Sequence, residues 1–234
     1  MPNVLITGAT GMVGKGVLLE CLRNPQIESV VLLNRRKINV QDAKIREILL
    51  DDFSKLETIK DQLKNIDACF HCMGVSSVGM SEEKFSELTF DITKNLADIC
   101  YGINPKMTFN YVSGTGTDST EKGRTMWARV KGRTENHILG RGFEKAYMFR
   151  PGFIIPENGI KSRTPLYNSI YVVMRPFFPL FKRMSSITTT TKIGQAMILT
   201  ALNPKTDNIF LENRQINALA EEFVSNSKKL IRLH

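Results

Sequence analysis

The fold of this chain is decided by one stretch, Val4-Leu5-Ile6-Thr7-Gly8-Ala9-Thr10-Gly11-Met12-Val13-Gly14. An apolar run too short for a helix meets three glycines spaced G-x-x-G-x-x-G, and an apolar-rich segment, Val17 to Leu22, follows them. This order predicts a strand, a tight turn and the beginning of a helix.

The glycine turn predicts dinucleotide binding. Glycine adopts backbone angles that a side chain would forbid, and it lets a pyrophosphate approach the main chain. The free N–H groups of the helix's first turn, with the positive end of its dipole, then hold the phosphate charge. A tight turn that binds nothing is the alternative. The residues expected at the cofactor are Gly8, Thr10, Gly11, Met12, Val13 and Gly14.

The composition is that of a soluble globular protein, with 42% hydrophobic and 24% charged residues among 234. This length favours one domain over residues 1–234. Met1-Pro2-Asn3 runs straight into the first expected strand, which leaves no room for a signal or transit peptide. No apolar stretch reaches the roughly 18 residues that a membrane span requires. We therefore expect a cytoplasmic protein without a membrane span.

The net charge of +9 is scattered along the chain and lacks interleaved basic and aromatic residues, so no specific nucleic-acid partner is expected. Cys69 and Cys72, with His71 between them, invite a redox or metal interpretation. The segment around them resembles a buried strand, however, and His137 and His234 are the only other histidines, so zinc lacks a ligand set. We expect reduced thiols and no metal.

Strands and helices alternate through the first two thirds of the chain, which predicts an α/β fold with a doubly wound parallel sheet. The expected strands are Val4–Ile6, Val30–Leu33, Ile48–Leu50, Asp67–Cys72, Thr108–Val112 and Ala146–Phe149. The expected helices are Lys15–Arg23, Leu56–Leu63, Glu82–Cys100, Thr125–Leu139, Lys192–Leu202 and Gln215–Leu230. Ser81 is expected to cap the long third helix.

The pattern changes after Arg150-Pro151-Gly152, because residues 153–190 are rich in proline, aromatic and basic residues. This segment is expected to form a small cap over the carboxyl ends of the strands, where ligands of open α/β sheets bind. Packing of the cap itself explains its apolar residues. A substrate pocket, a membrane-contacting patch, or a homodimer or protein-partner face through residues 165–183 are the alternatives.

The second strand ends in Asn34-Arg35-Arg36-Lys37, with no carboxylate among them. An acidic residue there would hold the ribose 2′-hydroxyl of NAD(H), whereas arginine pairs with the 2′-phosphate of NADP(H). We therefore predict NADP(H) rather than NAD(H), with Arg35 and then Arg36 at the phosphate. A solvated basic turn is the alternative. Asp52 is expected either to reach the adenine amino group or to cap the next helix.

Six motifs in order and spacing resemble those of the extended and atypical short-chain dehydrogenase/reductases of the NAD(P)-dependent epimerase/dehydratase type. Within this group the chain is similar to the oxidoreductases related to Tat-interacting protein 30. The motifs are Thr7–Gly14, Asn34–Lys37, Cys72-Met73-Gly74, Tyr111-Val112-Ser113, Val130-Lys131-Gly132 and Phe149-Arg150-Pro151-Gly152. The resemblance covers residues 3–160 well and implies a Rossmann-like fold, with Cys72, Gly74 and Pro151 also near the cofactor.

The resemblance also implies a mechanism based on a Y-x-x-x-K pair. The lysine binds the nicotinamide ribose and lowers the tyrosine pKa, so that the phenol acts as acid or base while hydride moves. Lys131 fits this lysine, and Ser113 or Thr115 fits the hydroxyl that holds the substrate oxygen. Four residues before Lys131 the chain has Trp127 instead of tyrosine.

The indole of Trp127 donates a hydrogen bond but transfers no proton at working pH. It is expected to line the site or to stack on the nicotinamide or an aromatic substrate; packing against the cap is the alternative. The proton would then come from water or from another side chain, such as Tyr167 or Tyr171. Two functions follow: an atypical NADP(H)-dependent oxidoreductase or epimerase/dehydratase acting on a small molecule, and a catalytically inactive NADP(H)-binding regulator.

Overall fold

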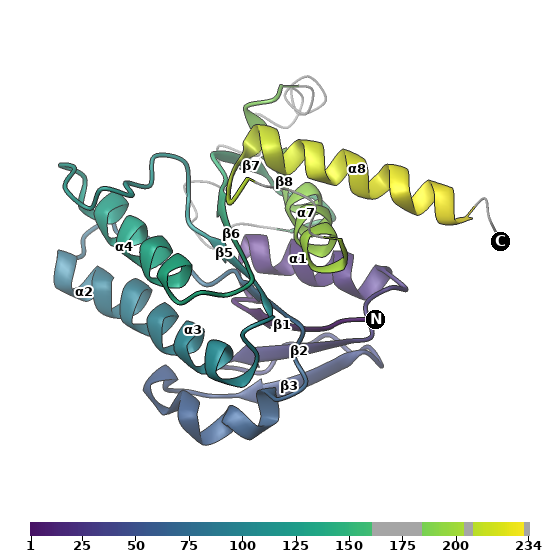
Figure 1. Ribbon diagram of the computed structural model, residues 1–234, viewed down its shortest axis with the longest axis horizontal. Coiled ribbons are helices and arrows are strands. Elements are labelled where there is room, and N and C mark those ends of the chain that lie inside the picture. The colour runs from purple at the N-terminus through teal and green to yellow at the C-terminus, as the bar shows by residue number, and fades with distance from the viewer. Residues whose placement is uncertain (161–183, 204–207, 232–234) are drawn as a thin grey trace.

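The computed structural model describes residues 1–160, 184–203 and 208–231. Within these residues seven strands form one parallel sheet in the order β3-β2-β1-β4-β5-β6-β9 (Figure 1). The strands are β1 (Asn3–Thr7), β2 (Ser29–Asn34), β3 (Ile45–Leu49), β4 (Ala68–His71), β5 (Thr108–Val112), β6 (Lys145–Arg150) and β9 (Phe210–Glu212). The strand order reverses at β1, which pairs with β2 on one side and with β4 on the other.

Helices cover both faces of the sheet, as the alternating pattern predicted (Figure 1). One face packs against α1 (Met12–Arg23) and α7 (Thr190–Leu202), with α8 (Asn213–Ile231) beside α7. The other packs against the 3₁₀ helix η1 (Phe53–Leu63) and α3 (Ile92–Ile103), and α4 (Met126–Gly140) lies next to α3. Because side chains alternate along a strand, Val4 and Ile6 pack in the core beneath α1 and α7, whereas Leu5 packs in the core beneath η1 and α3. The doubly wound, Rossmann-like fold is therefore confirmed.

Two expected elements have a different form. The third strand begins at Ile45 rather than Ile48. It lies at the edge of the sheet, where Arg46 is exposed and Leu49 is 54% exposed. Its first residues therefore lack the continuous apolar run by which a buried strand is recognised. The long third helix is made of α2 (Glu82–Ser86), a π-helical segment η2 (Glu87–Asp91) and α3. Ser81 caps it as predicted, accepting a hydrogen bond from the Lys84 N–H at 3.2 Å.

The segment expected as a cap is described only at its two ends. There, β7 (Phe153–Ile155) and β8 (Ile187–Thr189) pair in parallel, a contact that the sequence did not predict. Residues 161–183, which include Tyr167 and Tyr171 and the whole of the expected partner face (165–183), lie outside the described residues. Within the described ranges, each helix is too short or too polar to cross a membrane.

Candidate functional site

The glycine turn joins β1 to α1, and two of its glycines are required by packing. Gly8 has a φ of +73°, which is a left-handed conformation, and a Cβ there would lie 2.7 Å from the backbone of Cys72. A Cβ on Gly14 would lie 2.2 Å from the carbonyl oxygen of Gly8. Gly11 differs, since its φ is −83° and a Cβ would meet only the Gly8 oxygen, at 3.3 Å, among the described atoms. Gly11 is therefore the glycine whose missing side chain leaves space above the turn.

The N-terminus of α1 is open to an anion. Gly11 is its N-cap and provides no capping side chain, and the first turn of this fully described helix contains no acidic residue. The N–H groups of that turn and the positive end of the helix dipole are thus left for a ligand. A pyrophosphate fits this position by charge and by the space that a Cβ at Gly11 would fill.

Other predicted segments meet the glycine turn at the carboxyl edge of the sheet, where the strand order reverses. Cys72 follows β4, and a Cβ on Gly74 would find no described atom within 4 Å. After β5, a Cβ on Gly114 would lie 3.8 Å from the Pro151 carbonyl oxygen and 3.9 Å from Lys131 Nζ. The edge therefore brings together the cofactor segments and the lysine that the sequence predicted.

The basic turn follows β2. Arg35, Arg36 and Lys37 are exposed, whereas Asn34 is 4% exposed and donates a hydrogen bond from Nδ2 to Glu47 Oε1 at 2.9 Å. A hollow of about 860 Å³ lies beside the turn, lined in part by Lys37 and Glu47. Asp52 takes the second of its two expected roles: it caps η1, where its Oδ1 accepts from the Ser54 N–H at 2.9 Å.

Lys131 lies on α4 and donates a hydrogen bond from Nζ to the backbone carbonyl of Ser113. Burial lowers the pKa of Lys131 to about 8, against the opposing effect of the Glu135 carboxylate. The side chain is thus held at the end of β5, beside Gly114. With this pKa, the Lys131 side chain can be either protonated or neutral near neutral pH.

Neither predicted hydroxyl is free. Ser113 Oγ donates to Glu135 Oε1 at 2.5 Å, and Glu135 is fully buried. Arg150 Nε donates to the same carboxylate at 3.0 Å, and a second bond from its Nη2 makes the pair bidentate. Thr115 Oγ1 lies 2.9 Å from both the Arg150 carbonyl oxygen and Glu212 Oε2. The Ser113 hydroxyl therefore belongs to a buried ionic network, whereas the Thr115 hydroxyl is engaged with Arg150 and Glu212 at an exposed position.

The sequence did not predict this network. Glu135 lies four residues after Lys131, a spacing that places both side chains on one helix face. That spacing is a signal that could have found Glu135. Arg150 stands in a recognised motif, but nothing in the sequence indicates which carboxylate it meets.

The model of the NAD dependent epimerase/dehydratase family matches residues 4–123, just over half of the chain. The chain belongs to this family. The match runs from β1 through the loop after β5, so it includes the glycine turn, the basic turn and Ser113.

Two relatives show how the likeness continues beyond that range. Protein HTATIP2 of Rattus norvegicus is 26% identical over 155 residues, which span 65% of this chain and 63% of that protein. Protein FMP52, mitochondrial, of Meyerozyma guilliermondii is 22% identical over 236 residues, covering 94% of this chain and 96% of its own length. The names of the FMP52 relatives contradict the cytoplasmic location expected from the sequence, because they place those proteins in the mitochondrion.

Solved structures share the fold at low sequence identity. Bordetella bronchiseptica WbmH in complex with NAD⁺ superimposes with a TM-score of 0.64 and 13% identity over 87% of this chain and 72% of that one. A short-chain dehydrogenase from Burkholderia cenocepacia in complex with NADP gives 0.65 and 12% over 98% and 95%. Both cofactors therefore occur on this fold, and the choice between them depends on the side chains of each chain.

In this epimerase/dehydratase family member, Trp127 lies one helical turn before Lys131 and is half-buried. Like Met80 and Met126, it packs against a cluster of buried side chains that includes Phe85 and Phe90. A Cβ on Gly116, in the loop after β5, would lie 3.6 Å from Trp127 Cη2. The indole thus forms an apolar wall next to the loop that carries Ser113.

His71 is a structural residue of this family member's sheet. Its Nδ1 lies 2.6 Å from Thr7 Oγ1 and its Nε2 lies 2.9 Å from Thr93 Oγ1, and the ring is buried. Burial lowers the pKa of His71 to about 3, so the ring is neutral. This agrees with the buried strand that the sequence predicted around Cys69 and Cys72.

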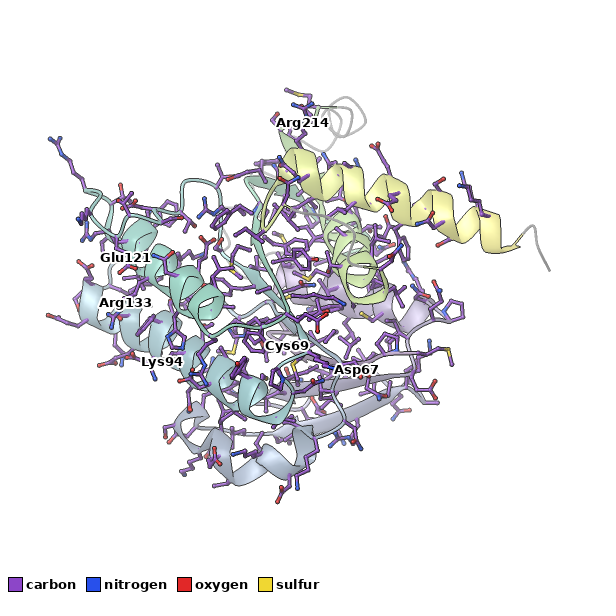
Figure 2. All side chains as sticks on the ribbon, viewed as in Figure 1. Asp67, Cys69, Lys94, Glu121, Arg133 and Arg214 are labelled. Atoms are coloured by element: carbon purple, nitrogen blue, oxygen red, sulfur yellow. The ribbon has the colours of Figure 1, made fainter. Side chains whose placement is uncertain are left out.

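The four cysteines, all within the described residues, are free thiols as expected. Cys69 lies among packed side chains between the sheet and α3 (Figure 2). Burial raises the pKa of Cys69, and that of Cys72 to about 12. Reactive thiols need the opposite shift. Among the described residues no group of histidine, cysteine and acidic side chains is arranged to hold a metal.

Proposed function

We propose that this protein is an NADP(H)-binding oxidoreductase of the short-chain dehydrogenase/reductase or epimerase/dehydratase type, acting on a small-molecule substrate. The open N-terminus of α1 carries the proposal, because Gly11 provides space above the turn and leaves the helix's first N–H groups without a side-chain cap. Thr10, Met12 and Val13 belong to the same turn and would contact the pyrophosphate.

Side chains after β2 support NADP(H) over NAD(H). Arg35 and Arg36 are exposed at the end of that strand, where the 2′ position of the adenosine ribose would lie. The residue that ends β2 is Asn34 rather than an acidic residue, and its amide is turned to Glu47 on the neighbouring strand β3. A guanidinium pairs with phosphate through two parallel hydrogen bonds.

When bound, the cofactor would supply hydride from C4 of its nicotinamide ring as NADPH, or accept hydride there as NADP⁺. Lys131 would hold the nicotinamide ribose, since its ammonium is fixed at the end of β5 by the Ser113 carbonyl. Trp127 would line the substrate side with its apolar face, together with Met80, which favours an apolar or aromatic substrate. The same wall excludes water from one side of the site.

The proton needs a donor other than Trp127. Ser113 and Thr115 are alcohols engaged with carboxylates, and an indole N–H does not ionise near neutral pH. Of the four residues predicted for catalysis, Lys131 is the one that holds and releases a proton in this range, with its pKa of about 8. Lys131 would therefore serve as the acid or base, directly or through a water molecule.

A catalytically inactive NADP(H)-binding regulator is the second candidate. The same engaged hydroxyls favour it, since Ser113 is committed to Glu135 and Thr115 to Arg150 and Glu212. Such a protein would bind the cofactor tightly without turnover, and its cofactor occupancy would change its affinity for a protein partner.

The deciding experiment measures binding and turnover separately. Fluorescence titration gives the affinities for NADPH and NADH, and NADPH absorbance reports oxidation with a panel of aldehydes, ketones, quinones and flavins. Wild type, Trp127→Tyr and Lys131→Met are compared. If the protein is an oxidoreductase, wild type should oxidise NADPH with at least one substrate of the panel, and Lys131→Met should abolish this turnover.

The outcomes separate the two candidates. Turnover by Trp127→Tyr alone indicates a reductase site that lacks one phenol and favours the regulator. Tight binding without turnover in all variants also favours the regulator. Failure of wild type to bind NADPH contradicts both.

A further inference from the structure

The basic turn after β2 is held at both ends by one carboxylate. Glu47 Oε1 accepts a hydrogen bond from Asn34 Nδ2 at 2.9 Å and another from the backbone N–H of Ile38 at 3.0 Å. Asn34 and Ile38 are the residues on either side of Arg35-Arg36-Lys37. A single side chain from the next strand therefore spans all three cations.

The strand register explains how Glu47 reaches both partners. Glu47 on β3 pairs with Leu32 on β2, and Leu49 pairs with Asn34. Because side chains two residues apart share a face, Glu47 lies on the same face as Asn34, one diagonal step away. Asn34 is 4% exposed, so its amide is anchored in the protein, while the three cations that follow are exposed to solvent.

We propose that Glu47 is a positioning residue that sets the preference for the 2′-phosphate by holding the turn in its binding conformation. This inference rests on the proposed function, in which Arg35 and Arg36 contact that phosphate. A held turn loses less conformational freedom on binding than a free one, and the gain applies to ligands that carry the 2′-phosphate.

The negative charge of Glu47 acts in the opposite direction, because a carboxylate repels a phosphate. The two effects can be separated by substitution. Glu47→Gln removes the charge and keeps an acceptor oxygen for both donors, whereas Glu47→Ala removes the charge and the acceptor together. Asp42→Ala is the matched control: it removes one carboxylate from the same hollow, and the Asp42 side chain bonds to the Lys44 N–H rather than to the turn.

The test measures Kd for NADPH, NADH and 2′,5′-ADP by titration of wild type and of the three variants. We expect Glu47→Ala to weaken NADPH and 2′,5′-ADP by about tenfold, since two hydrogen bonds that order the turn are lost. NADH affinity should change by less than about twofold, since NADH does not use the turn's cations. Glu47→Gln and the Asp42 control should retain wild-type preference or favour NADPH slightly.

Two results would overturn the inference: an unchanged NADPH-to-NADH preference in Glu47→Ala, or tighter NADPH binding by it, which would show repulsion to be the main effect. A wild type that does not prefer NADPH contradicts the proposed function instead. If Glu47→Ala does not fold, Asn34→Ala removes one of the two bonds, and hydrogen exchange of the Ile38 amide in wild type reports the other. If the Ile38 amide exchanged as fast as in an unfolded chain, Glu47 would not hold the turn and the inference would be refuted.

Discussion

Gly11→Asp should abolish cofactor binding while leaving the fold intact. Gly11 has a φ of −83° and a ψ of 169°, which an L side chain adopts without strain, and a new Cβ would meet one oxygen at 3.3 Å. Aspartate is a favoured N-cap, and its charge interacts well with the helix N-terminus. We expect the free energy of unfolding to stay within about 1 kcal/mol of wild type, and Tm within about 4 °C.

The effect on binding follows from Coulomb's law. The new carboxylate would occupy the place where the pyrophosphate charge is expected. Two unit charges about 4 Å apart, at an effective dielectric of about 20, repel by about 4 kcal/mol. That energy corresponds to about a thousandfold increase in the Kd of NADPH.

Gly11→Asn is the matched control, because asparagine caps the helix equally well without a charge. Isothermal titration of NADPH into wild type and both variants, with Tm measured by calorimetry, separates steric from electrostatic loss. The Asp-to-Asn ratio in Kd should shrink as salt is raised. A folded Gly11→Asp variant whose Kd lies within threefold of wild type would show that the phosphate does not bind at this helix terminus.

Four further predictions use other parts of the site. Gly8→Ala should lower Tm, since alanine at a φ of +73° costs about 1–2 kcal/mol before its clash with the Cys72 backbone is counted. Glu135→Ala leaves the Arg150 guanidinium, 14% exposed, without its buried partner. We expect a loss of about 3–5 kcal/mol and a Tm lower by roughly 6–20 °C in calorimetry; a drop below about 3 °C would contradict a buried pair. Arg35→Ala should weaken NADPH by about 10- to 100-fold in titration and NADH by less than about twofold; equal losses would place Arg35 away from the 2′-phosphate. His71 is neutral when folded and has a pKa of about 3, so its stabilising contribution is complete above the unfolded pKa of 6.5 and is lost as pH falls toward 3. Urea unfolding should show the free energy falling by up to about 1.4 kcal/mol per pH unit below pH 6.5, and His71→Asn should remove that slope between pH 6.5 and 5.

Because the Ser113 and Thr115 hydroxyls are hydrogen-bonded to carboxylates, the Trp127→Tyr variant tests whether a phenol alone supplies the missing proton donor. A phenol one turn before Lys131 would restore the proton donor that the resemblance implies. Ser113 would nevertheless remain bonded to Glu135. Turnover gained by this single change would show that the buried network supports the site without supplying its acid.

Local patterns in the sequence predicted the fold. The glycine spacing and the apolar runs concern residues within about one turn or one strand of each other, and those interactions form the same way wherever the segment lies. Ser81 was identified as a cap for this reason. Strand β9 was missed because it is three residues long, and its place in the sheet depends on pairing with β6, some sixty residues earlier.

The sequence by itself determined the Rossmann-like sheet, the open helix terminus at Gly11 and the absence of an acid after β2, since each depends on neighbouring residues. Its prediction of a cytoplasmic location was wrong, since relatives of this chain are named as mitochondrial proteins. Only the tertiary structure decided that Glu47 holds the basic turn, that Glu135 takes the Ser113 hydroxyl and pairs with Arg150, and that Asp52 caps a helix. The first two are contacts between side chains 13 to 22 residues apart. Such contacts form only when packing brings two elements together, and no periodicity in either element records which partner the other will present.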